Sequence, residues 1–367
     1  MLIGVPKEVK DFEYRVSVTP DGVHLLRQHG HQVVVEPSAG QGSGFSDEAY
    51  RHAGAEVVAS KEEVFQRAEL IVKVKEPQLS ECALFRPGQV LFTYLHLASL
   101  PDLTKALMAA EVTAIAYETV EARDHSLPML RPMSEIAGRL AVQVGAHYLG
   151  TVQGGRGVLL AGVPGVLPGH VVVLGAGVVG TSAVRIAVGL GAQVTVINLD
   201  LDRLRVLDDL YGGRIATCAA TESAIERAVM QADLVIGAVL VPGARAPRVI
   251  SRSLVSKMQV GSVIVDVAVD QGGCCETTRP TTHSDPVYTV DGVVHYCVTN
   301  MPGIVPHTST RALTNVTLPY LVRLASDGVE KAIRSDAGLA KGVNVMNGKI
   351  TCQAVAESHG LRFTPLL

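Results

Sequence analysis

The sequence predicts an α/β protein with two doubly wound domains, a cleft between them, and long helices that link them. Apolar strand-like segments alternate with helical segments along most of the chain, which indicates parallel strands joined by helical crossovers. The length of 367 residues is enough for two domains, and 47% of the residues are hydrophobic, enough to build their cores. Trp is absent while Val, Ala and Gly are abundant, as is typical of covered parallel sheets.

Composition also excludes several classes of partner. A net charge of −3 without basic runs predicts that the chain binds no nucleic acid. The six cysteines lack metal-ligand spacing, and the N-terminus lacks a secretion signal, so we expect reduced thiols in a cytoplasmic protein. Residues 157–184 contain no Asp, Glu, Lys or Arg, but Pro164, Pro168 and several glycines interrupt them. We therefore predict no membrane span and no membrane partner.

The first predicted domain comprises residues 1–131 and 304–367. It begins with strand Leu2–Val5 and with a helix whose N-cap is Thr19 and whose first residue is Pro20. The other predicted strands cover 31–36, 70–75, 90–96 and 113–117, and the other predicted helices cover 47–53, 62–68, 101–110 and about 309–325. Strands separated by helices in this way predict a doubly wound sheet.

The second predicted domain comprises residues 132–303. A long helix is expected to begin at Ser134, with its apolar residues four apart on one face: Ile136, Leu140, Val144 and Tyr148. The predicted strands after the glycine turn described next cover 193–197, 234–236, 262–266 and 293–298.

A glycine-rich turn follows the apolar run that starts at Val171, and it has the pattern Gly175-x-Gly177-x-x-Gly180. The first glycine allows a tight turn, the second allows the backbone to approach a pyrophosphate, and the third lets helix and strand pack closely. An apolar strand precedes the motif and a helical pattern follows it, so the turn predicts a Rossmann-like dinucleotide site.

Candidate chemical groups stand near the ends of strands, where ligands bind to open parallel sheets. Arg15 could clamp a carboxylate, although it could also be a surface arginine. Lys73 and Lys75 alternate on an apolar strand, and Lys75 is the better placed of the two because it is the last residue before Glu76-Pro77. His96 ends its strand and could carry a proton, although a lone histidine is more often structural.

Asp270 follows the strand that ends near Val269 and opens a glycine loop, which could place its carboxylate toward the nicotinamide end of the cofactor. Asp266, inside the same strand, is open to a structural interpretation. The loops after the two neighbouring strands, at 239–243 and 298–302, are candidate walls of the nicotinamide pocket.

Many stretches, in order, resemble bacterial L-alanine dehydrogenase along nearly the whole chain. They include Gly4-Val-Pro-Lys-Glu8, Val72-Lys-Val-Lys-Glu-Pro77, Leu91-Phe-Thr-Tyr-Leu-His-Leu97, Pro132-Met-Ser-Glu-Ile-Ala-Gly-Arg139 and Val265-Asp-Val-Ala-Val-Asp-Gln-Gly-Gly-Cys274. This family is related to the transhydrogenase alpha subunit, and its members are cytoplasmic, usually hexameric enzymes of two domains that open and close over a cleft.

The resemblance implies reversible NAD-dependent conversion of L-alanine to pyruvate and ammonia. Arg15 and Lys75 would bind the substrate, and His96 and Asp270 would be the catalytic acid–base groups. The residues implied to contact NAD are Ser134, Gly175, Gly177, Val178, Val179, Gly180, Asn198, Arg203, Val239, Leu240, Val267, Ala268, Val269, Asp270, Arg279, Val298, Thr299, Asn300 and Met301. The implied partners are small molecules, and the implied assembly is a homohexamer.

The sequence departs from the family pattern at two places. Asn198 stands where the family usually carries an aspartate that holds the adenosine ribose, and Asp200 follows two residues later. Because an asparagine lacks the charge that repels a 2′-phosphate, we predict NAD use with weaker exclusion of NADP. Some members place a metal near the C-terminal segment, but Arg323 and Asp327 make a poor ligand pair, so we predict no metal.

Two other functions stay open at this point. The nucleotide-binding part of a proton-translocating NAD(P) transhydrogenase is similar in its amino-terminal motifs, but the Tyr94-Leu-His96 and Asp270-Gln-Gly-Gly273 segments argue against it. A non-catalytic NAD-responsive binding protein on the same fold is the other alternative, and the four polar candidates make it the weaker one.

Overall fold

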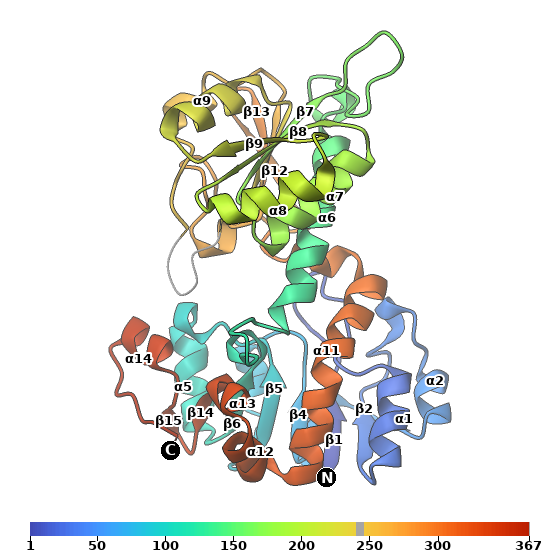
Figure 1. The fold of residues 1–367 in the computed structure, drawn as a ribbon. Helices are drawn as coiled ribbons and strands as arrows, with labels where there is room; N and C mark the ends of the chain where they lie inside the picture. The colour runs from blue at the N-terminus through green and yellow to red at the C-terminus, as the bar shows by residue number, and fades with distance from the viewer. Residues whose placement is uncertain (240–245, 367) are drawn as a thin grey trace. The chain divides into compact units, whose positions relative to one another are not determined.

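The computed structural model describes residues 1–239 and 246–366, which form two compact units. The first unit contains residues Met1–Met133 and Gly303–Leu367, and the second contains Ser134–Pro302 (Figure 1). Each unit is an α/β layer structure built on its own sheet. Within the described residues, no helix combines the length and apolar character needed to cross a membrane.

The first unit has an eight-stranded sheet in the order β15-β14-β6-β5-β4-β1-β2-β3. Its strands are β1 (Leu2–Val5), β2 (Gln32–Val35), β3 (Glu56–Val57), β4 (Leu70–Val72), β5 (Val90–Thr93), β6 (Thr113–Ala116), β14 (Val343–Met346) and β15 (Lys349–Ile350). The six strands from β1 to β6 pair in parallel, whereas β14 and β15 extend one edge in antiparallel pairing.

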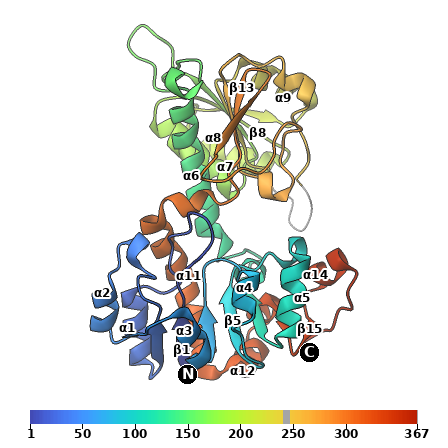
Figure 2. The same ribbon diagram turned by 180° about the vertical axis from the view of Figure 1, so that it is seen from behind.

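Helices cover both faces of this sheet. They are α1 (Pro20–Gln28), α2 (Asp47–His52), α3 (Lys61–Arg67), α4 (Leu79–Cys82), α5 (Pro101–Ala109), α11 (Pro306–Asp327), α12 (Val329–Ser335), α13 (Ala337–Gly342) and α14 (Gln353–His359). Views from opposite sides show α1 and α11 over one face and α3, α4 and α5 over the other (Figures 1 and 2). Fully buried Phe65 and Leu107 pack with the strand residue Leu91 in the core under α3–α5.

The second unit has a seven-stranded sheet in the order β12-β13-β11-β10-β7-β8-β9. Its strands are β7 (His170–Leu174), β8 (Gln193–Asn198), β9 (Ala216–Ala219), β10 (Leu234–Gly237), β11 (Val263–Asp266), β12 (Val287–Val290) and β13 (Val293–Tyr296). Its helices are α7 (Val178–Gly189), α8 (Leu201–Tyr211), α9 (Glu222–Gln231) and α10 (Arg252–Val255), together with most of α6 (Leu130–Tyr148). All strand pairs are parallel except β12 with β13.

The two sheets order their first five strands in the same way. Counted from the first strand of each unit, both run 3-2-1-4-5, after which the first sheet continues with β6 and the second with β13 and then β12. Each sheet therefore has a point where the chain changes direction: between β1 and β4 in the first unit and between β7 and β10 in the second. Ligands of such sheets bind in the crevice at this switch point, outside the carboxyl ends of the strands. The topology therefore places one candidate binding edge in each unit.

The α/β prediction with two parallel-dominated sheets is confirmed, but several element boundaries were wrong. The long helix begins at Leu130 rather than Ser134, and the last helix of the predicted set spans Pro306–Asp327 rather than 309–325. The strand predicted over 70–75 ends at Val72, and the one predicted over 90–96 ends at Thr93. The antiparallel strands β12, β14 and β15 were not expected.

Candidate active site

The switch point of the first unit is tied together by buried charges. Glu8 follows β1, and its Oε1 accepts a hydrogen bond of 2.6 Å from the backbone N–H of Val74, which follows β4. Lys73 is fully buried, with Nζ 3.1 Å from Glu8 Oε2 and 3.2 Å from Glu81 Oε1. Although burial alone would lower the pKa of Lys73, the two carboxylates raise it. Lys73 is therefore a structural cation that closes this end of the sheet.

Lys75 lies two residues further on and differs in its surroundings. Its side chain keeps 12% of its surface exposed, and Nζ is 3.7 Å from Glu76 Oε2, an oxygen whose carboxylate also pairs with Lys10. Burial lowers the pKa of Lys75, and the neighbouring cations Lys10 and Arg15 add to this, outweighing the attraction of Glu76. A reachable ammonium with a lowered pKa is suited to bind, or exchange a proton with, a polar substrate atom.

Arg15 is a buried guanidinium held in a fixed orientation. Its Nε and Nη2 donate to the two carboxylate oxygens of Glu13 at 2.7 and 2.5 Å, and its Nη1 faces the sulfur of Met133 at 3.1 Å. A thioether is a weak acceptor, so a ligand carboxylate would compete well for the Nη1 side of the fork. Glu13 is a site residue that was not predicted from the sequence, where an acid two residues before a candidate arginine is the local signal that could have suggested it.

His96 does not end a strand as predicted; it lies three residues beyond β5, in the left-handed region with φ +50° and ψ +35°. Its backbone N–H donates to Glu118 Oε1 at 2.6 Å, and its imidazole stacks on the ring of Tyr94 with an interplanar angle of 2°. The imidazole remains accessible, with 41% of the side chain exposed. Tyr94 is buried and its hydroxyl donates to the backbone oxygen of Met129 at 2.5 Å.

These contacts place three predicted site residues along one edge of the first unit. The positive charge of Arg15 helps to lower the pKa of Lys75, and it offsets part of the rise that burial causes in the pKa of Tyr94. The Tyr94 ring in turn stacks on His96. Thr93, just before Tyr94, also donates its hydroxyl to the backbone oxygen of Lys75 at 3.0 Å. The edge thus offers two cations and an imidazole. Such a set can bind a small carboxylate and exchange protons with the atoms beside it.

In the second unit, the three motif glycines meet three different constraints. Gly175 has φ +104°, and a Cβ there would lie 2.5 Å from the backbone oxygen of Ala238. At Gly180 a Cβ would lie 1.9 Å from the backbone oxygen of Gly175, so only glycine lets α7 pack this close. At Gly177, by contrast, a Cβ would meet nothing closer than Arg203 Nη1 at 3.7 Å. Packing does not demand a glycine at 177, whereas the close approach of a pyrophosphate does.

The N-terminus of α7 adds backbone amides to the glycine turn, and we call the two together the cradle. The N-cap is Gly177, which offers no side-chain acceptor to the N–H groups of the first turn, where Val178, Val179 and Gly180 stand. These amides and the helix dipole suit a phosphate group. Beside them lies a hollow of about 400 Å³, lined by Ala176, Gly177, Val178, Thr181, Asp202, Arg203, Val206 and Leu207. The residues present therefore fit a dinucleotide.

Asn198, at the end of β8, braces the glycine turn. Its Oδ1 accepts the backbone N–H of Ala176 at 3.0 Å, and its Nδ2 donates to the backbone oxygen of Asp200 at 2.9 Å. Asp200 is the N-cap of α8 and lies 3.4 Å from Arg203 Nε. Asn198 thus uses both ends of its amide on the protein, an arrangement that an aspartate could only half reproduce.

Asp270 does not follow a strand directly, because β11 ends at Asp266 and Asp270 lies in the 3₁₀ turn Val269–Gln271, where it is exposed. Asp266 is fully buried and shapes this loop: its carboxylate accepts from the backbone N–H of Ala268 and Cys274 and from the Thr278 hydroxyl. Burial raises the pKa of Asp266 in spite of these bonds. Asp266 is a structural acid, and Asp270 is the one presented to solvent.

The remaining predicted cofactor residues lie in the second unit. Arg279 places its guanidinium 4.2 Å from the centre of the Tyr288 ring, and the backbone oxygen of Asn300 bonds His283 at 2.8 Å. Val239 and Ser134 are half-buried, as are the side chains of Val267 and Asn300. The others are Ala268, Val269, Val298 and Met301, which are buried, and Thr299, which is exposed. Leu240 lies outside the described residues.

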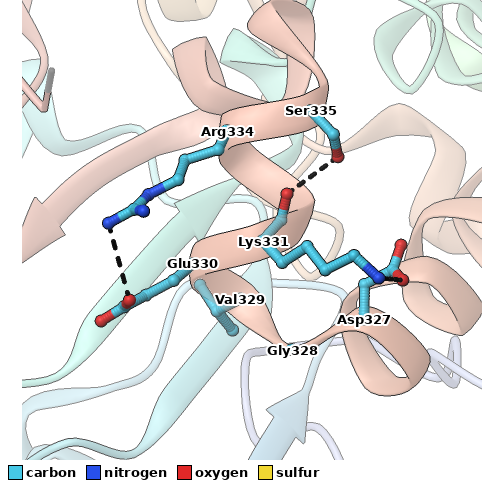
Figure 3. Close-up of a pocket in the computed structure, with 7 residues that line it drawn as sticks. All are labelled: Asp327, Gly328, Val329, Glu330, Lys331, Arg334 and Ser335. Carbon is cyan, nitrogen blue, oxygen red and sulfur yellow. Dashed lines mark hydrogen bonds and ion pairs between the residues drawn. The ribbon is translucent and has the colours of Figure 1, made fainter.

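A larger hollow of about 570 Å³ lies elsewhere, around the junction of α11 and α12 (Figure 3). Its charges pair along the helix: Lys331 with Asp327 at 2.9 Å and Arg334 with Glu330 at 3.9 Å. Nearby, Arg323 donates to Asp336 at 2.5 Å. Within the described ranges, no three His, Cys, Asp or Glu side chains gather as metal ligands would. This hollow contains neither glycine turn nor candidate acid–base group.

Comparison with known proteins adds an independent line of observation. The model of the alanine dehydrogenase/PNT N-terminal domain matches residues 4–137, and that of the C-terminal domain matches residues 141–353. The alanine dehydrogenase of Halomonas elongata is 56% identical over 99% of this chain and 98% of that protein. The chain belongs to the alanine dehydrogenase family. It is accordingly an oxidoreductase.

Solved structures agree with this membership. A structure of L-alanine dehydrogenase, 55% identical in sequence, superposes with a TM-score of 0.95 and covers 98% of this chain and 99% of its own. A transhydrogenase structure from Sinorhizobium meliloti has a TM-score of 0.82 at 24% identity, covering 96% of this chain and 100% of its own, which shows a shared fold only. Both units are thus Rossmann-like, and a dehydrogenase of this fold uses a nicotinamide cofactor.

Proposed function

We propose that the protein catalyses the reversible, NAD-dependent oxidative deamination of L-alanine to pyruvate and ammonia. The observation that carries this proposal is the different chemistry at the two switch points. The first unit offers Arg15, Lys75 and His96 at its edge, whereas the second offers a glycine turn built for a pyrophosphate. Alanine dehydrogenase is also the printed name of the relative at 56% identity.

Substrate binding is assigned to Arg15 and Lys75. Arg15 is held rigidly by Glu13, so little side-chain entropy is lost when its Nη1 side binds the carboxylate of alanine or pyruvate. Lys75 then lies beside the α-carbon substituent and donates to the carbonyl oxygen of pyruvate. Its lowered pKa makes this ammonium a better proton donor than an ordinary lysine.

Acid–base catalysis is assigned to His96 and Asp270. NAD would be held by the glycine turn, Asn198, Arg203 and the loops at 239–240, 267–270 and 298–301. It would accept the hydride that Cα of alanine gives up as the substrate amine, after losing a proton, becomes an iminium group. His96 activates the water that attacks the iminium carbon and returns a proton as ammonia leaves. The Asp270 carboxylate stabilises the cationic imine. General acid–base help of this kind is typically worth about 10²–10⁴-fold in rate.

The domain assignment, the cofactor and the assembly belong to the same proposal. Residues 1–131 with 304–367 bind the substrate, and residues 132–303 bind NAD. We propose a cytoplasmic homohexamer without a bound metal, and the six cysteines, all free thiols, suit a reducing compartment. Mass photometry of the purified chain tests the assembly directly.

The decisive test is a kinetic screen of L-alanine, L-serine, 2-aminobutyrate and the matching 2-oxo acids with NAD and NADP. We expect alanine with NAD, and pyruvate with ammonia and NADH, to be turned over fastest. Replacing His96 with Ala is expected to lower kcat by at least about 10²-fold. Hydride exchange between NAD and NADP without any amino-acid turnover would instead favour the transhydrogenase alternative. NAD binding without any turnover would favour a binding protein.

A further inference from the structure

His96 is one of the few described residues other than glycine whose backbone lies in the left-handed region. This region is unfavourable for a residue with a side chain, and such a residue stays in it where its surroundings hold it there. His96 has φ +50° and ψ +35°, immediately before the 3₁₀ turn Leu97–Ser99. Something in the fold therefore fixes the direction in which the imidazole is presented.

Glu118 supplies the main restraint. It lies in the turn Tyr117–Thr119 that follows β6, and β6 pairs with β5, the strand before His96. Glu118 Oε1 accepts the backbone N–H of His96 at 2.6 Å and that of Leu95 at 3.2 Å, and Oε2 also lies 3.2 Å from the Leu95 N–H. Two successive amides that point the same way thus share one carboxylate with only 13% of its side chain exposed.

The other contacts of His96 complete the restraint but do not replace it. The His96 carbonyl accepts from the backbone N–H and hydroxyl of Ser99 at 3.1 and 3.0 Å, and the Tyr94 ring lies parallel to the imidazole. These contacts fix the chain after His96 and one face of its ring. Only Glu118 holds the amide that sets φ.

We propose that Glu118 is a positioning residue for the reaction, which locks His96 in its left-handed conformation and thereby aims the imidazole at the substrate. The inference rests on the proposed function of His96. In this proposal, His96 is held because the Glu118 oxygens lie close enough to accept hydrogen bonds from the amides of Leu95 and His96. The carboxylate charge, whose nearest oxygen is 3.9 Å from His96 Nδ1, is not the cause.

Two conservative substitutions separate the effect of the position of the Glu118 oxygens from the effect of the negative charge of the carboxylate. Glu118→Gln keeps the length and one acceptor oxygen but removes the charge, whereas Glu118→Asp keeps the charge but withdraws the oxygens by one methylene. We expect Glu118→Asp to lower kcat about 10²-fold, as misplacement of a catalytic group by about 1 Å does, and Glu118→Gln to stay within about tenfold of the wild type. The KM for L-alanine should change less than about threefold in both, because Arg15 and Lys75 are untouched.

A matched control is Glu121→Gln, which removes a carboxylate three residues away that pairs with Lys341 at 2.9 Å on the surface. It should leave kcat and KM unchanged. An Asp variant as active as the Gln variant, or more active, overturns the proposal, as does a loss that appears in KM rather than kcat. If the wild-type enzyme shows no alanine turnover, the proposed function fails instead. In that case a crystal structure of Glu118→Asp decides the inference: His96 should leave the left-handed region, and a retained φ near +50° contradicts it.

Discussion

The two units order their first five strands alike, but the residues at their switch points are of opposite kinds. In the second unit the turn between β7 and α7 is bare backbone, and its glycines bring the amides of a helix N-terminus to the surface. In the first unit the segments after β1 and β4 carry the charged side chains of Glu8, Lys73 and Lys75 instead of a glycine turn. One topology thus makes either a dinucleotide cradle or a cluster of charged groups, and local sequence decides which.

The largest effect is expected at the glycine turn of the second unit. Replacing Gly180 with Ala would place a Cβ 1.9 Å from the backbone oxygen of Gly175, which neither backbone can relieve without opening the turn. We expect NAD affinity to fall by more than about 10²-fold, because the amides proposed to bind the pyrophosphate lose their alignment. Isothermal titration calorimetry with NAD measures this loss.

The control lies in the same helix. Gly189 is the last residue of α7, and a Cβ there would meet nothing within 4 Å. Gly189→Ala should therefore leave NAD binding unchanged and raise stability by up to about 1 kcal/mol, because alanine is the better helix former. Equal NAD affinity in both variants would show that the turn is not the binding site.

The next test separates the two lysines of the first unit. Lys73→Met removes the partner of buried Glu8, so we expect the free energy of unfolding to fall by about 3–5 kcal/mol, with little change in the KM of the protein that remains folded. Lys75→Met should not lower stability, but it should lower kcat/KM for alanine by about 10²–10³-fold, as loss of one preorganised donor does. Urea unfolding and steady-state kinetics measure the two effects, and a result with the two roles exchanged would contradict the assignment.

Sequence patterns predicted the parts of this comparison that follow from backbone periodicity. Alternating apolar runs located β1, β4 and β5 of the first unit and β7, β8, β10, β11 and β13 of the second, and the glycine spacing located the tight turn between β7 and α7. The patterns failed where side chains decide the conformation. Lys73 and Lys75 looked like strand residues, but β4 stops at Val72, after which Lys73 pairs with Glu8, which follows β1, and with Glu81 of α4.

The same limit explains what was missed around His96 and at the C-terminus. No local pattern shows that Glu118 would bind the His96 amide, which is 22 residues away. The antiparallel strand β14 joins β6 from more than 200 residues away, through contacts such as Asn344 Nδ2 to the Thr119 hydroxyl at 2.8 Å. Interactions of this range leave no signature in a short stretch of sequence.

The two lysines also predict opposite responses to pH. Lys73 has a raised pKa in the fold, so its stabilising charge is fully present below the ordinary value of 10.5 and is lost only above it. Lys75 has a lowered pKa in the fold, so its side chain binds a proton more tightly in the unfolded chain. The protonated lysine therefore lowers the free energy of unfolding, and this loss becomes smaller as pH rises toward 10.5. Urea unfolding at pH 7 and pH 9.5 should show Lys75→Met gaining stability over the wild type at pH 7 and less at pH 9.5. A difference independent of pH would contradict this sign.

The smallest expected effect concerns the ribose end of the cradle. Asn198 braces the glycine turn through Ala176 and the β8–α8 loop through Asp200, and it brings no negative charge to the ribose. Asn198→Asp keeps the bond from Ala176 but loses the one to Asp200, and it adds a charge that repels a 2′-phosphate. We expect the ratio of kcat/KM with NAD to that with NADP to rise about tenfold, which is about 1.4 kcal/mol of discrimination.

Steady-state kinetics with both cofactors measures this ratio, and Asp202→Asn, which removes an exposed acid from the lining of the same hollow, serves as the matched change of charge. If the wild type already excludes NADP strongly and Asn198→Asp adds nothing, then Asp200 rather than residue 198 sets the cofactor preference. In that case Asn198 serves only to brace the turn, and the second unit, like the first, would place a charged side chain beside its ligand.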